Sequence, residues 1–339
     1  MQALDTHKRS KEAQQVFDTL KRKVVGQEEA VRILVDIVES YQAGFTEQGR
    51  PAGNALFLGP TGSGKTHTVE MLCKGLFGDE RACIKIDCGE FQHSHEISRL
   101  VGSPPGYLGH RETHPVFTDE ALAQFHTEKL KLSVVLFDEI EKASDALWNL
   151  MLGILDKAIL TLGDNRKVDF SKVIILMTSN LGSKQMETTI DGGMGYNTPE
   201  VSLSSVEGKI DTVVKDAAKR HFSPEFYNRI NHVAVFRTLT EEQIKEVLEI
   251  ELGQLQTRLL FNSKVKFFYH VLPLAKAKLI KEGFSKKYGA RNLKRAIDQR
   301  VLTPLARLVA SGQVMERDVL LIEDVGKEEF EFSIAKEKL

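Results

Sequence analysis

One eight-residue segment constrains the fold of this chain more than any other. It matches the pattern G-x-x-x-x-G-K-[ST] and lies between an apolar run at 55–58 and a helical pattern that starts at Lys65. The segment reads Gly59-Pro60-Thr61-Gly62-Ser63-Gly64-Lys65-Thr66. Its glycines let backbone N–H groups point at phosphate oxygens, and the helix N-terminus adds positive potential. Lys65 would reach the terminal phosphates and Thr66 would ligate Mg²⁺, so the segment predicts a nucleotide phosphate site rather than a simple glycine-rich turn.

Five short apolar runs indicate a sheet around this loop. They lie at 55–58, 83–86, 134–137, 173–177 and 233–236, and helical patterns separate them. Strands that alternate with helices are typical of a mostly parallel sheet covered on both faces. The sequence therefore predicts an α/β domain.

The chain is expected to contain two domains. A large domain at 1–236 would begin with an amphipathic helix at 9–23 and a second helix at 27–43. A smaller, mostly helical α+β domain at 237–339 would contain helices at 240–260, 271–283 and 291–310, with short strands near 265–268, 318–322 and 329–334. The stretch 182–205, rich in Gly, Ser and Thr, is expected to be a long mobile insertion.

Composition narrows the class of partner only slightly. The 46 Lys and Arg residues balance 47 Asp and Glu, which removes any bulk electrostatic argument for nucleic acid or a membrane surface. The three cysteines are odd in number and lack a CxxC pair, so they are expected to be reduced thiols. No stretch approaches about 18 consecutive apolar residues, and the expected location is cytoplasmic.

Polar residues follow two of the predicted strands. Asp138 and Glu139 end the run 134–137, where Asp138 would hold the Mg²⁺ shell and Glu139 would polarise the attacking water. The alternative is that the two acids only cap the next helix. Asn180 follows the run 173–177 and would either orient water against the γ-phosphate or stabilise a turn.

Six segments together resemble the C-terminal ATPase module of the Clp unfoldases ClpA, ClpB and ClpC. Their order and spacing match over about 24–322 of this chain. The segments are Val24-Val25-Gly26-Gln27, the phosphate loop, 136–143, 178–182, 224–230 and 288–295.

This resemblance implies a P-loop NTPase fold of the AAA+ type, with a five-stranded mostly parallel sheet, that binds ATP and Mg²⁺. Arg229 would be the finger that reaches into a neighbouring subunit's site, which implies a homo-oligomer, a hexameric ring in this family's pattern. Arg291 would be the second sensor, and Val24 and Val25 would pack on the adenine. Without the resemblance, Arg229 could equally be a surface arginine paired with Glu225, and the valines could be ordinary core residues.

The segment Gly106-Tyr107-Leu108-Gly109 is similar to the Clp pore loop, whose aromatic residue grips extended polypeptide. Gly and Pro on both sides favour an exposed loop, although Tyr107 could also tuck under it. The sequence then departs from the family at 110–115, which puts the substrate preference in doubt. It departs again at 157–163, where the family has a Gly-Arg turn.

A second loop, Met194-Gly195-Tyr196, is faintly similar to the loop by which ClpA and ClpC dock on a peptidase. A flexible surface loop is the simpler interpretation. The sequence also leaves open whether an adaptor protein is a partner of this chain.

Two functions from different classes are consistent with these features. The first is an ATP-driven unfoldase or remodelling ATPase that pulls polypeptide substrates past Tyr107 and Leu108 in a ring. The second is a nucleotide-switched module that remodels one dedicated partner protein without threading it. Action on DNA is disfavoured by the tyrosine loop and the neutral charge.

Overall fold

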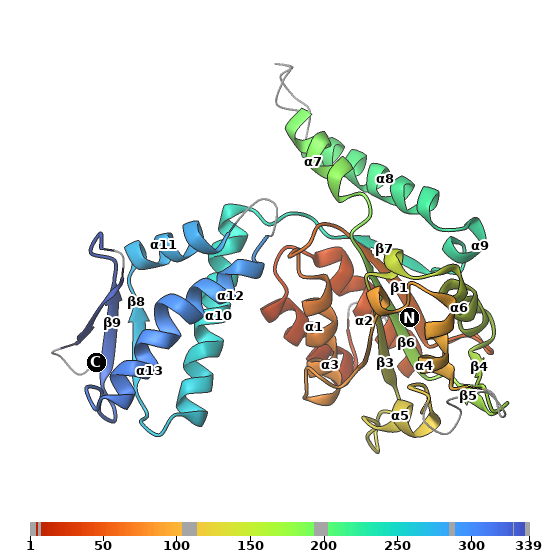
Figure 1. The fold of residues 1–339 in the computed structure, drawn as a ribbon, viewed down its shortest axis with the longest axis horizontal. Coiled ribbons are helices and arrows are strands. Elements are labelled where there is room, and N and C mark those ends of the chain that lie inside the picture. Colours follow the sequence, from red (N-terminus) through yellow and green to blue (C-terminus); the bar gives the residue numbers. More distant parts are fainter. Residues whose placement is uncertain are drawn as a thin grey trace. The chain divides into compact units, whose positions relative to one another are not determined.

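The computed structural model describes residue 5 and residues 8–103, 114–192, 203–284, 289–327 and 329–335. The chain divides into two compact units. The first contains Met1–Pro60 and Gly64–Arg237, and the second contains Thr61–Ser63 and Thr238–Leu339. Each unit is described by itself below (Figure 1).

The first unit combines a central sheet with helices on both faces. Its strands are β1 (Gly53–Leu58), β2 (Ile84–Asp87), β3 (Ser133–Asp138), β4 (Ile159–Thr161), β5 (Lys167–Asp169), β6 (Val173–Ser179) and β7 (His232–Val235). Its α-helices are α1 (Lys11–Lys23), α2 (Glu28–Gln42), α3 (Lys65–Phe77), α4 (Ser98–Val101), α5 (Asp119–Ala123), α6 (Asp145–Lys157), α7 (Ser183–Gly192), α8 (Leu203–His221) and α9 (Pro224–Tyr227). The described residues of this unit also form the 3₁₀ turns η1 (Cys88–Glu90), η2 (Ser94–Ile97) and η3 (Ile140–Lys142).

The five long strands form one parallel sheet in the order β2-β3-β6-β1-β7. Side chains alternate between its faces because successive residues of a strand point in opposite directions. Along β1, Ala55 and Phe57 join the apolar cluster that contains α1, α2 and α3, whereas Leu56 and Leu58 join the cluster that contains α6 and α8. The predicted five-stranded sheet with helices on both faces is confirmed.

The second unit is built from helices and a small sheet. It contains α10 (Glu241–Asn262), β8 (Phe268–Val271), α11 (Pro273–Gly283), α12 (Arg291–Ile297), the π-helix η4 (Asp298–Leu302), α13 (Thr303–Ala310), β9 (Val319–Glu323) and β10 (Glu331–Ile334). The strands pair in the order β10-β9-β8. Thr240 caps α10 by accepting from the N–H of Gln243, whose side chain accepts from the N–H of Thr240 in return.

Three local expectations were inaccurate. Part of the predicted insertion at 182–205 is the helix α7, and residues 193–202 lie outside the described residues. The strand expected at 265–268 begins only at Phe268, and Phe267, which precedes it, is buried in the core. The helix expected over 291–310 is interrupted by the π-helix η4.

The departure at 157–163 has a structural consequence. Ala158 ends α6 with φ of 49°, the left-handed conformation that glycine adopts most readily at the end of a helix. Its methyl group is buried in the core, and the short β4–β5 hairpin follows it.

None of the helices in the described part of the chain is long and apolar enough to cross a membrane.

Candidate nucleotide site

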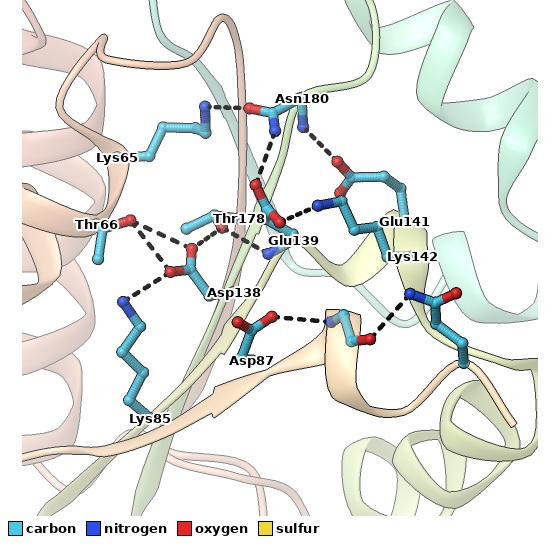
Figure 2. A network of polar contacts seen from close by, with 12 residues as sticks. Lys65, Thr66, Lys85, Asp87, Asp138, Glu139, Glu141, Lys142, Thr178 and Asn180 are labelled. Carbon is cyan, nitrogen blue, oxygen red and sulfur yellow. Dashed lines mark hydrogen bonds and ion pairs between the residues drawn. The ribbon is translucent and has the colours of Figure 1, made fainter. Parts of the chain in front are cut away.

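Three neighbouring strands bring the predicted site residues together. β3, β6 and β1 are adjacent in the parallel sheet, so their carboxyl ends meet at one edge. The phosphate loop follows β1, Asp138 ends β3 with Glu139 directly after it, and Asn180 follows β6 (Figure 2). This edge is where open parallel sheets bind their ligands.

Lys65 lies at the centre of this edge, and its side chain is buried. Its ammonium group donates to the carbonyl oxygens of Gly59 and Pro60, at 2.7 and 2.9 Å, and to Oδ1 of Asn180, at 2.9 Å. A buried charge is tolerated only where such acceptors surround it. The ammonium is therefore held beside the loop, where phosphate oxygens could replace some of these acceptors.

The loop needs glycine at its first position. Gly59 has φ of 150°, and a Cβ atom built there would collide with the carbonyl oxygen of Phe236, which follows β7. Gly62 and Gly64 also have positive φ, of 78° and 99°. Gly64 immediately precedes α3, so the loop leads directly into the N-terminus of that helix.

Asp138 is surrounded by three donors. Its Oδ2 lies 2.8 Å from Nζ of Lys85 on β2, and Oγ1 of Thr66 lies 3.2 and 3.5 Å from its two oxygens. The hydroxyl of Thr178 on β6 donates to its Oδ1. Burial opposes ionisation of Asp138, but the Lys85 ammonium and the two hydroxyls outweigh it and hold the pKa of this carboxyl below its ordinary value.

Glu139 occupies an unusual backbone position. Its φ of 58° and ψ of 48° place it in the left-handed region, which few residues other than glycine adopt. Its N–H donates to Oγ1 of Thr178 at 3.0 Å, so one buried hydroxyl bridges Asp138 and Glu139. Strained backbone of this kind is concentrated at functional sites.

Both carboxylate oxygens of Glu139 have partners. Oε1 accepts from Nδ2 of Asn180 at 3.3 Å, and Oε2 accepts from the ammonium of Lys142. Residues three apart in a 3₁₀ turn lie directly above one another, so η3 brings Lys142 beside Glu139. The hydrogen bond to Glu139 raises the pKa of Lys142, and this ammonium stays charged at neutral pH.

Asn180 connects the two halves of the site. Its side chain accepts from Lys65 and donates to Glu139, and its backbone N–H donates to Oε1 of Glu141 at 3.1 Å. The carbonyl oxygen of Asn180 also accepts from the backbone N–H and the hydroxyl of Ser183, so Asn180 takes part in a turn as well, and its role in orienting water stays a prediction. In Figure 2, dashed lines join the side chain of Asn180 to Lys65 and to Glu139.

Four polar residues of this network were not singled out from the sequence: Lys85, Glu141, Lys142 and Thr178. Lys85 and Thr178 belong to strands, and their role depends on which strands are neighbours. Glu141 and Lys142 belong to a segment that was quoted only for the resemblance. The alternation of Lys85 with the apolar residues Ile84 and Ile86 in β2 was the available signal.

The remaining predicted residues lie elsewhere. Arg229 follows α9, and its Nε lies 2.7 Å from Oδ1 of Asp156 on α6, a partner that the sequence did not suggest. Val24 caps the C-terminus of α1 and is buried with α1, α2 and α3, and Val25 next to it is partly buried. Arg291 is the first residue of α12, in the second unit.

Two predicted loops fall outside the described residues. These are the segment with Tyr107 and Leu108, within 104–113, and the segment with Met194, Gly195 and Tyr196, within 193–202. Both assignments stay predictions.

Comparison with known proteins bears on this geometry. The profile of the family described as "AAA domain (Cdc48 subfamily)" matches residues 50–233, more than half of the chain. A second profile, the "C-terminal, D2-small domain, of ClpB protein", matches residues 239–322. The chain belongs to the AAA+ family, as a module of the Clp type. The predicted resemblance is confirmed.

Individual relatives of this AAA+ module agree with the profiles. The ATP-binding subunit ClpC of the ATP-dependent Clp protease of Staphylococcus aureus (strain USA300) is 37% identical over 323 residues, which are 94% of this chain and 37% of ClpC. ClpC of Staphylococcus saprophyticus is likewise 37% identical, over 322 residues. The chain therefore spans little more than a third of the length of these curated relatives.

Solved structures give the same result. A closed-state electron cryomicroscopy reconstruction of Hsp104 with ATPγS and FITC casein matches with a TM-score of 0.75 and 32% identity. The S. cerevisiae Hsp104–ADP complex matches with a TM-score of 0.77 and 30% identity. These matches cover 95% and 94% of this chain and 52% of each Hsp104 chain.

Proposed function

We propose that this AAA+ module hydrolyses ATP at the edge of its parallel sheet and uses the energy to act on protein substrates. The observation that carries the proposal is the position of Asn180, which contacts both Lys65 and Glu139. Lys65 is suited to bind the terminal phosphates, and Glu139 is suited to activate the attacking water. Asn180 would therefore align the phosphate with the water that attacks it.

The residues around Asp138 are a suitable set of ligands for Mg²⁺. A threonine hydroxyl and a carboxylate are hard oxygen donors, and Thr66 and Asp138 present them side by side. Thr66 and Asp138 would hold Mg²⁺ there, and the ion would supply positive charge that offsets the charge of the phosphate groups. Thr178 would orient Asp138 for this task, because its hydroxyl fixes one carboxylate oxygen.

The remaining nucleotide contacts are assigned by family. Backbone N–H groups of residues 59–66 would bind phosphate, Val24 and Val25 would pack on the adenine, and Arg291 would act as the second sensor. Arg229 would stabilise the charge on the phosphoryl group in the neighbouring subunit, an effect worth on the order of 10³–10⁵ in rate. Shared sites of this kind require a homo-oligomer, which we propose to be a hexameric ring.

The action on protein is argued from the relatives. One matched Hsp104 reconstruction contains FITC casein, and ClpC is named as a subunit of an ATP-dependent protease. By analogy, Tyr107 and Leu108 would grip polypeptide at the ring axis, and the module would work in the cytoplasm. The alternative is a nucleotide-switched module that remodels one partner without threading it.

Electron microscopy of the Glu139→Gln variant with ATP and a labelled unfolded protein tests the proposal. We expect rings with polypeptide in the pore and Arg229 at the neighbouring nucleotide. Monomers that bind ATP without a pore would favour the switch. In a parallel assay, Tyr107→Ala should keep basal ATP hydrolysis and lose unfolding of a folded model substrate, and unchanged unfolding would contradict the pore assignment.

Peptidase docking is a separate proposal. Deletion of Met194, Gly195 and Tyr196 should slow the degradation of a model substrate by a candidate peptidase while ATP hydrolysis continues. An unchanged degradation rate would rule this docking loop out.

A further inference from the structure

Two ring nitrogens contact the turn that follows Glu139. Nε1 of Trp148 on α6 donates to the carbonyl oxygen of Ile140 at 3.1 Å, and Nε2 of His221 at the end of α8 lies 3.2 Å from the carbonyl oxygen of Glu141. His221 donates in the tautomer that carries its proton on Nε2. Consecutive carbonyl groups of η3 are thus tied to two different helices. Any movement of this turn must break these contacts or carry the rings with it.

The same rings pack against the segment that leads to Arg229. The ring centroid of Trp148 lies 5.5 Å from that of Phe222 and 6.2 Å from that of Phe226, and the Trp148 and Phe226 rings are stacked. His221 packs edge-on against Trp148, with centroids 5.7 Å apart. Both phenylalanines are buried, so this aromatic cluster (Trp148, His221, Phe222 and Phe226) is a packed unit. Packed side chains have few alternative arrangements and transmit displacements.

Two further contacts extend from the aromatic cluster to Arg229. The carbonyl oxygen of Phe226 accepts from the backbone N–H of Arg229 at 3.1 Å. The side chain of Arg229 is paired with Asp156, and Asp156 lies on α6, the same helix as Trp148. The side chain of Arg229 is therefore positioned by α6, which contacts the turn after Glu139, and its backbone by Phe226, which packs against Trp148 of that same helix.

We propose that Trp148 and His221 are positioning residues that link Glu139 in one subunit's own site to the Arg229 that the subunit offers to its neighbour. When the Glu139 turn shifts with the state of the nucleotide, the aromatic cluster shifts α9 and changes the placement of Arg229. The link rests on the proposed function, because it requires that sites be shared between subunits. A purely structural role for the cluster would stabilise the fold without affecting the neighbour.

Rings assembled from two different variants distinguish the positioning role of the aromatic cluster from a purely structural one. A Glu139→Gln subunit cannot hydrolyse ATP but still offers its Arg229, whereas an Arg229→Ala subunit keeps its Glu139 and offers no finger. An equimolar mixture should hydrolyse ATP faster than either variant alone. Adding Trp148→Phe to the Glu139→Gln subunit keeps an aromatic ring and removes the N–H donor. Because this subunit contributes only its finger, a loss of activity in rings that assemble to the same extent comes from the placement of Arg229.

We expect a Glu139→Gln subunit that also carries Trp148→Phe to lower the ATPase activity of the mixture at least threefold, compared with the Glu139→Gln subunit alone. The nucleotide affinity should stay unchanged. A matched control is Tyr269→Phe, placed in the same Glu139→Gln subunit. It removes the hydrogen bond from the hydroxyl of Tyr269 to the carbonyl oxygen of Leu252 in the second unit and should leave the activity of the mixture unchanged. Equal activity of the mixtures that contain the Trp148→Phe subunit and the Tyr269→Phe control subunit would overturn the link.

A second pair of variants protects the test against misfolding of Trp148→Phe. In the donor subunit, His221→Leu should lower the activity of the mixture, and His221→Gln, which keeps a donor group, should restore most of it. Equal activity with Leu and Gln would overturn the role of His221. If the parent mixture of Glu139→Gln and Arg229→Ala is no faster than its components, the shared site itself is wrong, and the link fails with it.

Discussion

Thr178→Val tests the architecture of the site most sharply among single substitutions. The hydroxyl of Thr178 donates to Asp138 and accepts from the N–H of Glu139, and valine keeps the shape of the side chain while removing both bonds. A neutral hydrogen bond contributes about 1 kcal/mol, and one to a charged group about 1.5–3 kcal/mol. Because the side chain is fully buried, water cannot replace the lost partners. We therefore expect the free energy of unfolding to fall by about 2–4 kcal/mol.

The assay is urea unfolding followed by tryptophan fluorescence. Trp148 is the only tryptophan of the chain and lies in the first unit, so its signal reports on the unit that contains the site. With a urea dependence of about 3 kcal/mol per molar, the midpoint should fall by about 1 M. Thr178→Ser is the control, because it keeps the hydroxyl and loses one methyl group, worth about 1 kcal/mol. If valine is as stable as serine, the bridging role of the hydroxyl is refuted.

The pH dependence of this effect has a definite sign. The pKa of Asp138 is lower in the folded protein than in the unfolded chain, so its contribution is present above the unfolded pKa, near 3.9, and is lost as the pH falls through the folded pKa. The difference between wild type and Thr178→Val should thus be largest at pH 7 and shrink toward pH 3. A difference that does not change with pH would mean that Thr178 does not stabilise the ionised carboxylate.

Two further substitutions test the loop and the metal site. Gly59→Ala should lower the free energy of unfolding by about 2–5 kcal/mol, because it adds backbone strain and a clash with the carbonyl oxygen of Phe236. An unchanged midpoint in the same urea assay would contradict this geometry. Lys85→Met removes the ammonium that competes with Mg²⁺ for Asp138, so the Mg²⁺ concentration that half-saturates binding of a fluorescent ATP analogue should fall about fivefold, or about 1 kcal/mol. Lys85→Arg should behave as wild type, and a higher Mg²⁺ requirement for Lys85→Met would show that Lys85 does not compete.

Much of the site could be predicted from local sequence. The phosphate loop and the acidic pair each carry their chemistry within a few consecutive residues, and each follows an apolar run long enough to be a buried strand. The order β2-β3-β6-β1, by contrast, is decided by packing between distant segments. The contacts of Asp138 with Lys85 and Thr178 depend on that order, and for this reason they were not predicted.

Other features escaped prediction because they rest on backbone geometry or on packing. The left-handed conformation of Glu139 and that of Ala158 leave no mark in a pattern of apolar residues. Trp148 is partly buried and packs against the core, but its hydrogen bond to Ile140 depends on tertiary packing that local sequence does not encode. The pairing of Arg229 with Asp156 likewise depends on how α6 and α9 pack together.

The central claim is that Glu139 activates water at a site where Lys65 and Asn180 bind the phosphate. It is tested most directly by measuring the turnover number and the ATP dissociation constant of Glu139→Gln beside the wild type. The amide keeps the hydrogen bond with Asn180 within reach and cannot accept a proton. We predict a turnover number at least about 100-fold lower and a dissociation constant close to that of the wild type. Hydrolysis at the wild-type rate would contradict the assignment of Glu139 as the base.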